Sequence, residues 1–344
     1  MKTIDLRSDT VTLPTSEMMD AINSATLGDD VYVEDSSTIE LENLAATITG
    51  KEAGLLVSSG TMGNLISCLV HAPRGTEAIM GHKSHIFIYE SGGISAYGGI
   101  HSHQLKNDDN GTIDINMIKD AIRIDDVHFP VTSLICLENT HNKCYGFPLE
   151  LDYINSVCDI AHENKIKVHM DGARLFNACV VLGESADKIT ENVDSVTFCL
   201  SKGLASPIGS VICGSTNFIA EARRIRKSLG GGMRQTGIIA AAGIVSLNQM
   251  RNRLKDDHAN AKYLANGLHK LPGIELNINY VPTNIIFFNF NHPDMSSSDL
   301  VNHMKSHGII FSDYNGKHCR LVLHHGISRD DVEKVIDVFN KLLS

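Results

Sequence analysis

The feature that most constrains the fold of this chain is a repeated alternation of short apolar runs, polar turns and helix-like segments. Such runs recur at residues 77–81, 132–142, 166–183, 195–203 and 209–215. The alternation predicts an α/β domain with a large, mainly parallel sheet. The active groups of such domains lie at the carboxyl ends of the strands. We therefore take as candidates the polar residues at these ends, namely His85, His141, Asp171 and Lys202.

The length of the chain and a change of pattern near residue 250 predict two domains. A chain of 344 residues is too long for one small core. A helical pattern at residues 256–271 is followed by short strand-like runs, and Ser328 precedes a last amphipathic helix. We predict a large domain over residues 1–250 and a smaller C-terminal α+β domain over residues 251–344.

The composition argues against several classes of partner. The formal net charge is -10 and the basic residues are scattered, so nucleic acid and anionic membrane surfaces are poor candidates. No apolar run is long enough to span a bilayer, and the first residues lack the pattern of a secretory signal, so we expect a cytoplasmic protein. The eight cysteines form no C-x-x-C pair, and we interpret them as reduced core residues, with no metal site expected.

Lys202 and Asp171 together indicate a chemistry. Lys202 follows the apolar run of "SVTFCLSKGLASP", and Asp171, 31 residues earlier, ends the run of "VHMDGARLFNA". Each has a simpler interpretation, as a solvent-facing lysine and as a helix-capping aspartate. Adjacent parallel strands would instead bring both into one cleft. Such a pair suits pyridoxal 5'-phosphate (PLP), because the amine forms a Schiff base and the carboxylate keeps the ring nitrogen protonated.

The stretch "SSGTMGN" is a candidate phosphate site. An apolar run at residues 55–57 leads into Gly60 and Thr61 at the start of a helical pattern, where free N–H groups attract anions. Capping for stability alone explains the same residues. The chain has no G-x-x-x-x-G-K-[ST] loop and no G-x-G-x-x-G fingerprint, which argues against nucleoside triphosphates and nicotinamide cofactors. His85 and His141 fit either a structural role or a place beside a ring cofactor.

Taken together, ordered motifs over nearly the whole chain resemble the threonine aldolases of the β-eliminating lyase group. They include "LRSDTVTLPT", "SSGTMGN", "ENTHN", "HMDGARLFNA", "CLSKGLASPIGSV" and "LGGGMRQTGIIAAAG". The resemblance implies the aspartate-aminotransferase-like fold of PLP enzymes, fold type I. It also implies that Lys202 forms the Schiff base and that Asp171 pairs with the ring nitrogen. In the same way, His85 would stack on the ring, and Gly60 and Thr61 would hold the phosphate.

The resemblance implies further site residues and an assembly. A clamp for the substrate carboxylate would consist of Ser8, Arg174 and Arg320, with Arg174 also near the cofactor. Basic residues that bind the cofactor and a tyrosine that binds substrate would reach across a subunit interface, and these are Lys227, Arg234 and Tyr32. The family pattern implies a homotetramer, a dimer of dimers with shared active sites.

The implied activity is that of a carbon–carbon lyase, or aldehyde-lyase. It would cleave L-threonine or L-allo-threonine, which are β-hydroxy-α-amino acids, to glycine and acetaldehyde by a retro-aldol reaction. A base must take the β-hydroxyl proton, and His85 and His141 are both candidates. The same cofactor also supports β-elimination and racemisation, because the fold does not decide which bond breaks. A non-catalytic protein that has kept the fold is a further alternative.

Overall fold

The larger part of the molecule is built on a seven-stranded sheet with the order β2-β8-β7-β6-β5-β3-β4. The structure is a computed structural model that describes residues 3–314, 316 and 318–344. β8 runs antiparallel to both of its neighbours, and the other neighbouring pairs are parallel. The strands are β2 (Ala53–Val57), β3 (Glu77–Gly81), β4 (His101–Leu105), β5 (Thr132–Glu138), β6 (Lys167–Asp171), β7 (Ser195–Cys199) and β8 (Ser210–Gly214).

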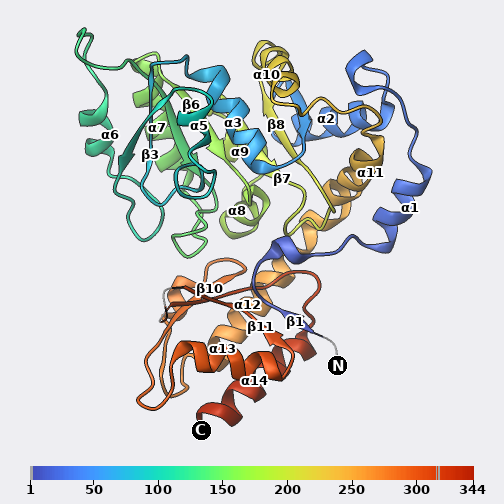
Figure 1. The fold of residues 1–344 in the computed structure, drawn as a ribbon, viewed down its shortest axis with the longest axis vertical. Helices are drawn as coiled ribbons and strands as arrows, with labels where there is room; N and C mark the ends of the chain where they lie inside the picture. Colours follow the sequence, from blue (N-terminus) through green and yellow to red (C-terminus); the bar gives the residue numbers. More distant parts are fainter. Residues whose placement is uncertain (1–2, 315, 317) are drawn as a thin grey trace.

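Helices cover both faces of this sheet (Figure 1), which explains why its central strands are apolar at successive positions. On one face, α3 (Gly60–His71) and α10 (Thr216–Ser228) pack against β2 and β8. The other face is covered by α2 (Ser36–Ile48), α7 (Leu151–Glu163), α8 (Leu175–Leu182), α9 (Ala186–Thr190) and α11 (Gly237–Val245). The predicted α/β fold with a mainly parallel sheet is confirmed.

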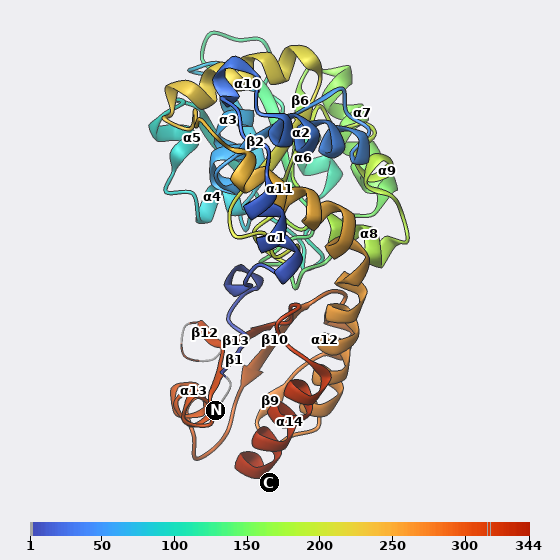
Figure 2. The ribbon, with the colours of Figure 1, turned by 90° about the vertical axis from the view of Figure 1, so that its right-hand side faces the viewer.

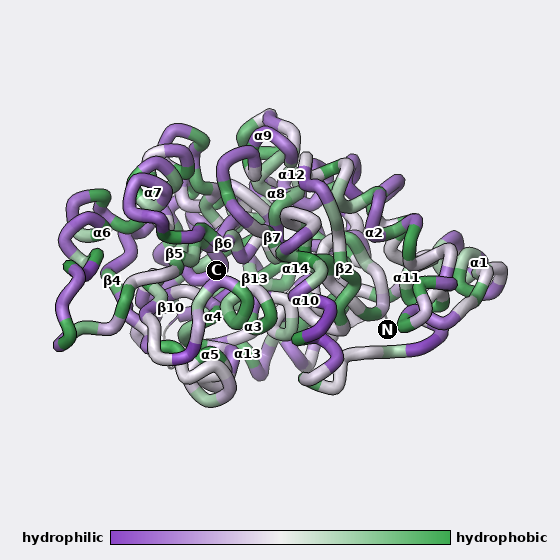
Figure 3. The backbone as a smooth tube through the Cα atoms, turned by 90° about the horizontal axis from the view of Figure 1, so that it is seen from above, coloured by the Kyte–Doolittle hydropathy of each residue, from purple (hydrophilic) through white to green (hydrophobic). Residues whose placement is uncertain are grey.

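Shorter helices complete the larger part. They are α1 (Ser16–Ser24), α4 (His85–Ile88), α5 (Gly93–Ala96) and α6 (Ile115–Ala121). Seen from above, hydrophilic residues lie mostly along the outer loops and helices (Figure 3). Seven of the eight cysteines are buried and all eight are free thiols, as expected for small hydrophobic residues. Among the described residues, none of the helices has the length and apolar character needed to cross a membrane.

The C-terminal part has a four-stranded antiparallel sheet with the order β12-β13-β10-β9. The strand-like pattern of residues 274–279 forms only a short strand, because the Asn277 side chain accepts a hydrogen bond from the Asn279 N–H group (3.0 Å) and starts a 3-10 turn. The elements are α12 (Leu254–Leu268), β9 (Ile274–Glu275), β10 (Ile285–Phe290), α13 (Ser297–Ser306), β11 (Ile309–Ile310), β12 (Ser312–Tyr314), β13 (His318–Val322) and α14 (Arg329–Leu343).

The last helix begins where the capping pattern places it. Ser328 and Asp331 form a reciprocal capping box at the start of α14. The apolar stripe behind it buries Val332, Val335 and Phe339 in the C-terminal core. The start of this helix could be predicted from sequence because Ser328 and Asp331, the two partners of the capping box, lie within one turn.

The N-terminal segment joins the two parts of the molecule. β1 (Ile4–Asp5) pairs in parallel with β11, and the carbonyl oxygen of Leu6 accepts a hydrogen bond from the Val322 N–H group (2.8 Å). A few residues later, the Thr12 hydroxyl donates to the carbonyl oxygen of Lys202 (3.0 Å). Figure 2 shows this segment running from the lower part of the molecule to the upper part. The domain division at residue 250 stays a prediction.

Candidate active site

One cleft brings together the charged residues that the sequence singled out. It has a volume of about 110 Å³ and lies where the ends of β5 and β6 meet the N-terminal segment and β13. Six of the predicted site residues line it: Ser8, His85, Asp171, Arg174, Lys202 and Arg320. A larger hollow of about 800 Å³ between α2, α8 and α12 contains none of them. We place the site in the smaller cleft, because oppositely charged groups converge there.

Asp171 and Lys202 reach the cleft from adjacent strands. β6 and β7 are parallel, with Asp171 opposite Thr197, and Lys202 follows the end of β7. Asp171 is only 2% exposed, and its Oδ1 atom accepts a hydrogen bond from the Ala173 N–H group (3.1 Å). α8 begins only at Leu175, so this contact forms a turn and does not cap the helix. The predicted convergence of the two residues is therefore present in the fold.

The end of the cleft around Asp171 is acidic, and we call Asp171, Glu90, His85 and Asn64 the acidic end. The Asn64 amide nitrogen donates to Glu90 Oε1 (2.8 Å) and to Asp171 Oδ2 (2.9 Å). His85 Nδ1 lies 2.9 Å from Glu90 Oε1. Burial acts to lower the pKa of His85, but the Glu90 hydrogen bond and the charge of Asp171 outweigh it, and the pKa is raised. Burial raises the pKa of Glu90.

Buried histidines support Asn64 from behind. His169 Nε2 lies 3.1 Å from Asn64 Oδ1, and the Ser195 hydroxyl lies 2.8 Å from both His169 Nδ1 and His71 Nε2. Burial lowers the pKa of His169 to about 3 and that of His71 to about 4, so both rings are neutral near pH 7. A neutral His169 that donates through Nε2 keeps the Asn64 oxygen occupied. The Asn64 amide group must then face the two carboxylates.

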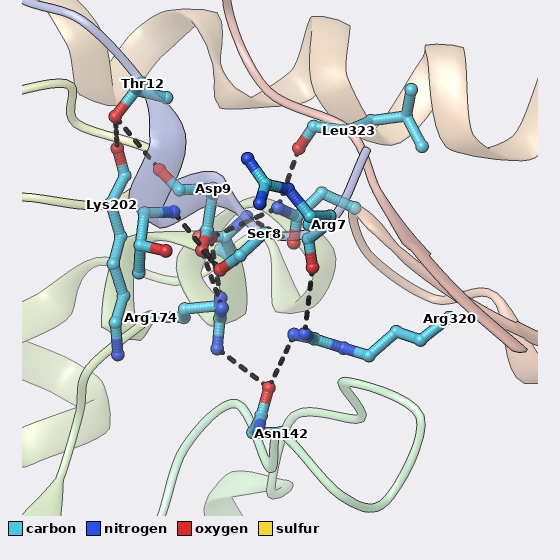
Figure 4. A network of polar contacts seen from close by, with 12 residues as sticks. Arg7, Ser8, Asp9, Thr12, Asn142, Arg174, Lys202, Arg320 and Leu323 are labelled. Carbon is cyan, nitrogen blue, oxygen red and sulfur yellow. Dashed lines mark hydrogen bonds and ion pairs between the residues drawn. The ribbon is translucent and has the colours of Figure 1, made fainter. Parts of the chain in front are cut away.

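The opposite end of the cleft is basic, and we call Arg174, Arg320, Asp9 and Asn142 the basic end. Arg174 donates to both carboxylate oxygens of Asp9, at 2.7 and 2.6 Å. Arg174 Nη1 and Arg320 Nη2 both donate to Asn142 Oδ1, at 3.2 and 2.8 Å (Figure 4). Burial acts to raise the pKa of Asp9, but Arg174 outweighs it and holds the pKa well below its ordinary value. Burial, and then the charge of Arg174, lower the pKa of Arg320.

Glu138 at the end of β5 connects the two ends. Its Oε2 atom accepts a hydrogen bond from the His85 N–H group (2.7 Å), and its Oε1 atom accepts one from the Asn142 N–H group (2.8 Å). His141 lies between Glu138 and Asn142 in the sequence, but it does not line the cleft. It is 1% exposed, and neither ring nitrogen has a hydrogen-bond partner among the described residues. The placement therefore favours His85 over His141 as the histidine that meets a substrate.

The other predicted residues lie outside this cleft. Gly60 and Thr61 form the first turn of α3, whose N-cap is Ser59. A Cβ atom on Gly60 would lie 3.0 Å from Cys199 Sγ, so this helix start packs closely against the end of β7, just before Lys202. Three further predicted residues are exposed and do not line this cleft. They are Tyr32, Lys227 and Arg234, and Arg234 forms an ion pair with Asp29 (3.0 Å).

Five residues with contacts in this site were not singled out from sequence, and they are Asp9, Asn64, Glu90, Glu138 and Asn142. Four of them lie inside quoted stretches, such as "LRSDTVTLPT", "SSGTMGN" and "ENTHN". What could have identified these four is that each is a polar residue inside a motif that resembles the threonine aldolases. Because each of them bonds to other groups of the chain that are distant in sequence or lie in the backbone, reasoning about the chemistry alone did not select them.

Comparison with known proteins assigns the class. The family model described as "Beta-eliminating lyase" matches residues 5–291, and the chain belongs to this family. A "Probable low-specificity L-threonine aldolase 2" of Arabidopsis thaliana is 46% identical over 99% of this chain and 98% of that protein. The "Low specificity L-threonine aldolase" of Escherichia coli K12 is 38% identical over 96% of this chain and 97% of that protein.

Solved structures confirm the fold. A putative L-allo-threonine aldolase from Listeria monocytogenes matches with a TM-score of 0.82 at 21% identity, covering 99% of this chain and 96% of that one. A serine palmitoyltransferase from Sphingomonas wittichii matches with a TM-score of 0.77 at 16% identity, covering 98% of this chain and 86% of that one. The predicted aspartate-aminotransferase-like architecture, fold type I, is therefore present.

Proposed function

We propose that this protein is a PLP-dependent threonine aldolase that cleaves L-threonine or L-allo-threonine to glycine and acetaldehyde. The observation that carries the proposal is the convergence of Lys202, Asp171 and two arginines in one small cleft. The family relation supports it, because relatives at 46% and 38% identity carry the name low-specificity L-threonine aldolase. An amine, a carboxylate and guanidinium groups are the partners that a pyridine ring and an amino acid need.

The residues present suit the cofactor. The Asp171 carboxylate accepts hydrogen bonds from Ala173 and Asn64 and retains lone pairs for a ring N–H group. The Thr140 hydroxyl is buried in the cleft wall and has no hydrogen-bond partner among the described residues. When bound, PLP supplies a protonated ring that accepts the electrons of the breaking bond. Lys202 would hold its aldehyde carbon, and the start of α3 at Gly60 would hold its phosphate.

We assign the transfer of the β-hydroxyl proton to His85. Its Nδ1 atom faces Glu90, so a proton on Nδ1 is donated to that carboxylate and Nε2 keeps its lone pair. His85 lines the cleft, which allows Nε2 to come within about 3 Å of a hydroxyl group, directly or through one water. The raised pKa of His85 makes it a stronger base than an ordinary histidine. His141, which has no face on the cleft, cannot make this contact without rearrangement.

Ser8, Arg174 and Arg320 would bind the substrate carboxylate at the basic end. All three line the same cleft as Asp171 and Lys202. Holding the carboxylate there fixes the rotation about the bond between nitrogen and Cα. This rotation decides which Cα bond stands perpendicular to the ring and therefore which bond breaks.

We also infer a cytoplasmic homotetramer, a dimer of dimers with shared active sites. Free thiols at all eight cysteines suit a reducing compartment. Tyr32, Lys227 and Arg234 are exposed and lie near other exposed apolar residues, such as Leu27 and Val33. A surface of this kind is typical of an interface. The molar mass from light scattering tests this assembly, and a monomer at assay concentration would contradict it.

The decisive experiment is a product assay with purified protein, PLP and each threonine diastereomer. We expect glycine and acetaldehyde in equal amounts. Release of 2-oxobutyrate would indicate β-elimination. Inversion at Cα, which gives D-allo-threonine from L-threonine and D-threonine from L-allo-threonine, would indicate racemisation. Neither product, with no uptake of cofactor, would favour a non-catalytic protein.

Lys202→Ala is the matching variant. It should abolish turnover and the visible absorbance of bound cofactor, because the amine that binds the aldehyde is gone. Lys188→Ala serves as the control, since Lys188 is exposed and pairs only with Glu191 on the surface (3.3 Å). Undiminished cleavage by the Lys202→Ala protein would refute the assignment.

A further inference from the structure

We propose that Asn142 is a positioning residue that holds the two guanidinium groups of the carboxylate subsite together while leaving their charge available. This inference rests on the proposed function and extends it to a residue that touches neither cofactor nor reacting atoms. The geometry points to it, because the Asn142 side-chain oxygen is the common acceptor of Arg174 Nη1 and Arg320 Nη2.

The orientation of the Asn142 amide follows from its neighbours. Both guanidinium groups are donors only, so the amide must present its oxygen to them and turn its NH₂ group away. The backbone of Asn142 is fixed as well, since its N–H group donates to the carboxylate of Glu138 (2.8 Å). Figure 4 shows the side chain rising between the two arginines from the loop below them. Asn142 is thus held on both its main chain and its side chain.

The charges at the basic end leave one cation unneutralised. Asp9 takes both donors on one edge of Arg174 and cancels its charge. Arg320 is buried and forms no ion pair with a carboxylate in the part of the chain that the structure describes, and its Nε atom has no hydrogen-bond partner there. A buried cation without a counter-ion is unfavourable until an anion binds. The subsite therefore suits a ligand with a single negative charge.

A neutral amide is the residue type that this balance requires. Two guanidinium groups that meet at one point repel each other, and a shared acceptor oxygen offsets this repulsion. An aspartate of the same size would do so more strongly, but it would also cancel the remaining positive charge. Each of the two terminal nitrogens carries a second hydrogen, with which it can donate to a carboxylate while the first stays on Asn142. Asn142 thereby preserves the preference for an anion.

The test compares two ligands that differ by one carboxylate. Glycine and methylamine are titrated into the PLP-loaded protein, and their dissociation constants are read from the change in cofactor absorbance. In Asn142→Asp, glycine should bind about 100-fold more weakly, because its carboxylate meets an uncharged subsite. Methylamine has no carboxylate, so its dissociation constant should stay within about threefold of that of the unmodified protein. The ratio of the two constants is the diagnostic quantity.

A second variant and a control separate positioning from general damage. Asn142→Ala removes the shared acceptor without adding charge. It should raise the dissociation constant of glycine about tenfold, and glycine should still bind more tightly than methylamine. Asn155→Asp makes the same chemical change on α7, where the side-chain oxygen accepts a hydrogen bond from Asn192 (2.9 Å), and this variant should bind both ligands normally. If Asn142→Asp does not fold, Asn142→Ala decides the question, and a glycine constant within about twofold of normal overturns the proposal.

The remaining outcomes also discriminate. Equal weakening of glycine and methylamine in Asn142→Asp would overturn the proposal, since it would mean that the residue has only a structural role. Cleavage of threonine by the unmodified protein, together with normal glycine binding by Asn142→Asp, would overturn this inference and leave the proposed function intact. An unmodified protein that binds neither PLP nor glycine would overturn both.

Discussion

At both ends of the cleft, an asparagine amide bridges two side chains of like charge. The acidic end uses the NH₂ group of the amide, and the basic end uses its oxygen. At the acidic end, the NH₂ group of Asn64 donates to the carboxylates of Glu90 and Asp171. At the basic end, the oxygen of Asn142 accepts from Arg174 and Arg320. Each asparagine bridges two groups of like charge that would otherwise repel each other at close range.

The difference between the ends lies in which charge is left over. Glu90 is paired with His85, and Arg174 is paired with Asp9. Asp171 at the acidic end and Arg320 at the basic end have no ion-pair partner among the described residues, and both line the cleft, as do Glu138 and Lys202. A neutral bridge leaves both charges uncancelled in a buried place. Under the proposed function, they would meet a cationic ring nitrogen and an anionic carboxylate. The cleft is thus polarised in the direction that an amino acid bound to PLP requires.

The largest expected effects come from removing these two charges, and they should fall on different kinetic constants. Asp171→Asn should lower kcat about 10²- to 10³-fold, because the charge that stabilises the developing carbanion is lost. Arg320→Ala should chiefly raise KM, by about 10- to 100-fold, because it weakens the hold on the substrate carboxylate. Steady-state kinetics with threonine separates the two constants.

Either variant could contradict the predicted division between an effect on kcat and an effect on KM. A high KM with normal kcat in Asp171→Asn would remove the functional distinction between the ends. Unchanged saturation behaviour in Arg320→Ala would exclude it from the carboxylate subsite. Cofactor content, measured after denaturation, provides the control for both variants.

The next effect concerns stability, and of the two ends of the cleft only the acidic end shows it. His169 supports Asn64, and burial lowers its pKa to about 3. The unfolded chain therefore binds a proton on His169 below pH 6.5 that the folded chain does not bind, so stability is lost as the pH falls from 6.5 towards 3. At pH 5 this amounts to about 2 kcal/mol. Thermal unfolding between pH 7.5 and 5 measures it.

His169→Gln should weaken this pH dependence, since one titrating group is removed. Part of it should remain, because burial also lowers the pKa of His71 and of His258 to about 4. His307→Gln is the matched control, because His307 is exposed. An equally steep loss of stability in His169→Gln would show that the support of Asn64 is not the acid-sensitive element. Between pH 7.5 and 5, the basic end should contribute nothing to the pH dependence of stability, because its charged groups do not titrate in that range.

The smallest effect tests the pair of His85 and Glu90. The pKa of His85 is raised because the Glu90 hydrogen bond and the charge of Asp171 outweigh the effect of burial. Glu90→Gln removes one of these charges, so the pKa of His85 falls and the acid limb of kcat/KM should move to lower pH. We expect the plateau to fall about tenfold, because the weaker base takes the proton less readily. An acid limb that stays in place would exclude His85 as the titrating base.

The sequence analysis predicted residues whose side chains can react with a cofactor or substrate, such as Lys202 and Asp171. It missed residues that position other side chains, such as Asn64 and Asp9. Lys202 and Asp171 could be paired because one strand–helix–strand unit separates them and the register of parallel strands is predictable. Asn64 and Asp171 are 107 residues apart, and Arg174 and Asp9 are 165 apart. Such contacts depend on how α3 and the N-terminal segment pack, and no local pattern encodes that packing.

The two histidines illustrate the same limit. His85 and His141 both follow apolar runs, and their sequence contexts do not distinguish between them. Their difference arises from Glu138, whose carboxylate caps the start of α4 beside His85 and also anchors the loop at Asn142. That loop turns His141 into the core. The choice between them therefore required the fold.

The N-terminal segment has a consequence for biosynthesis. Ile4 and Asp5 find their strand partners in Ile309 and Ile310, which the ribosome adds about 300 residues later. Until then, Ser8 and Asp9 have no fixed place beside Arg174, and this wall of the cleft is open. The nascent chain therefore cannot complete this wall of the cleft before residue 310 has been made.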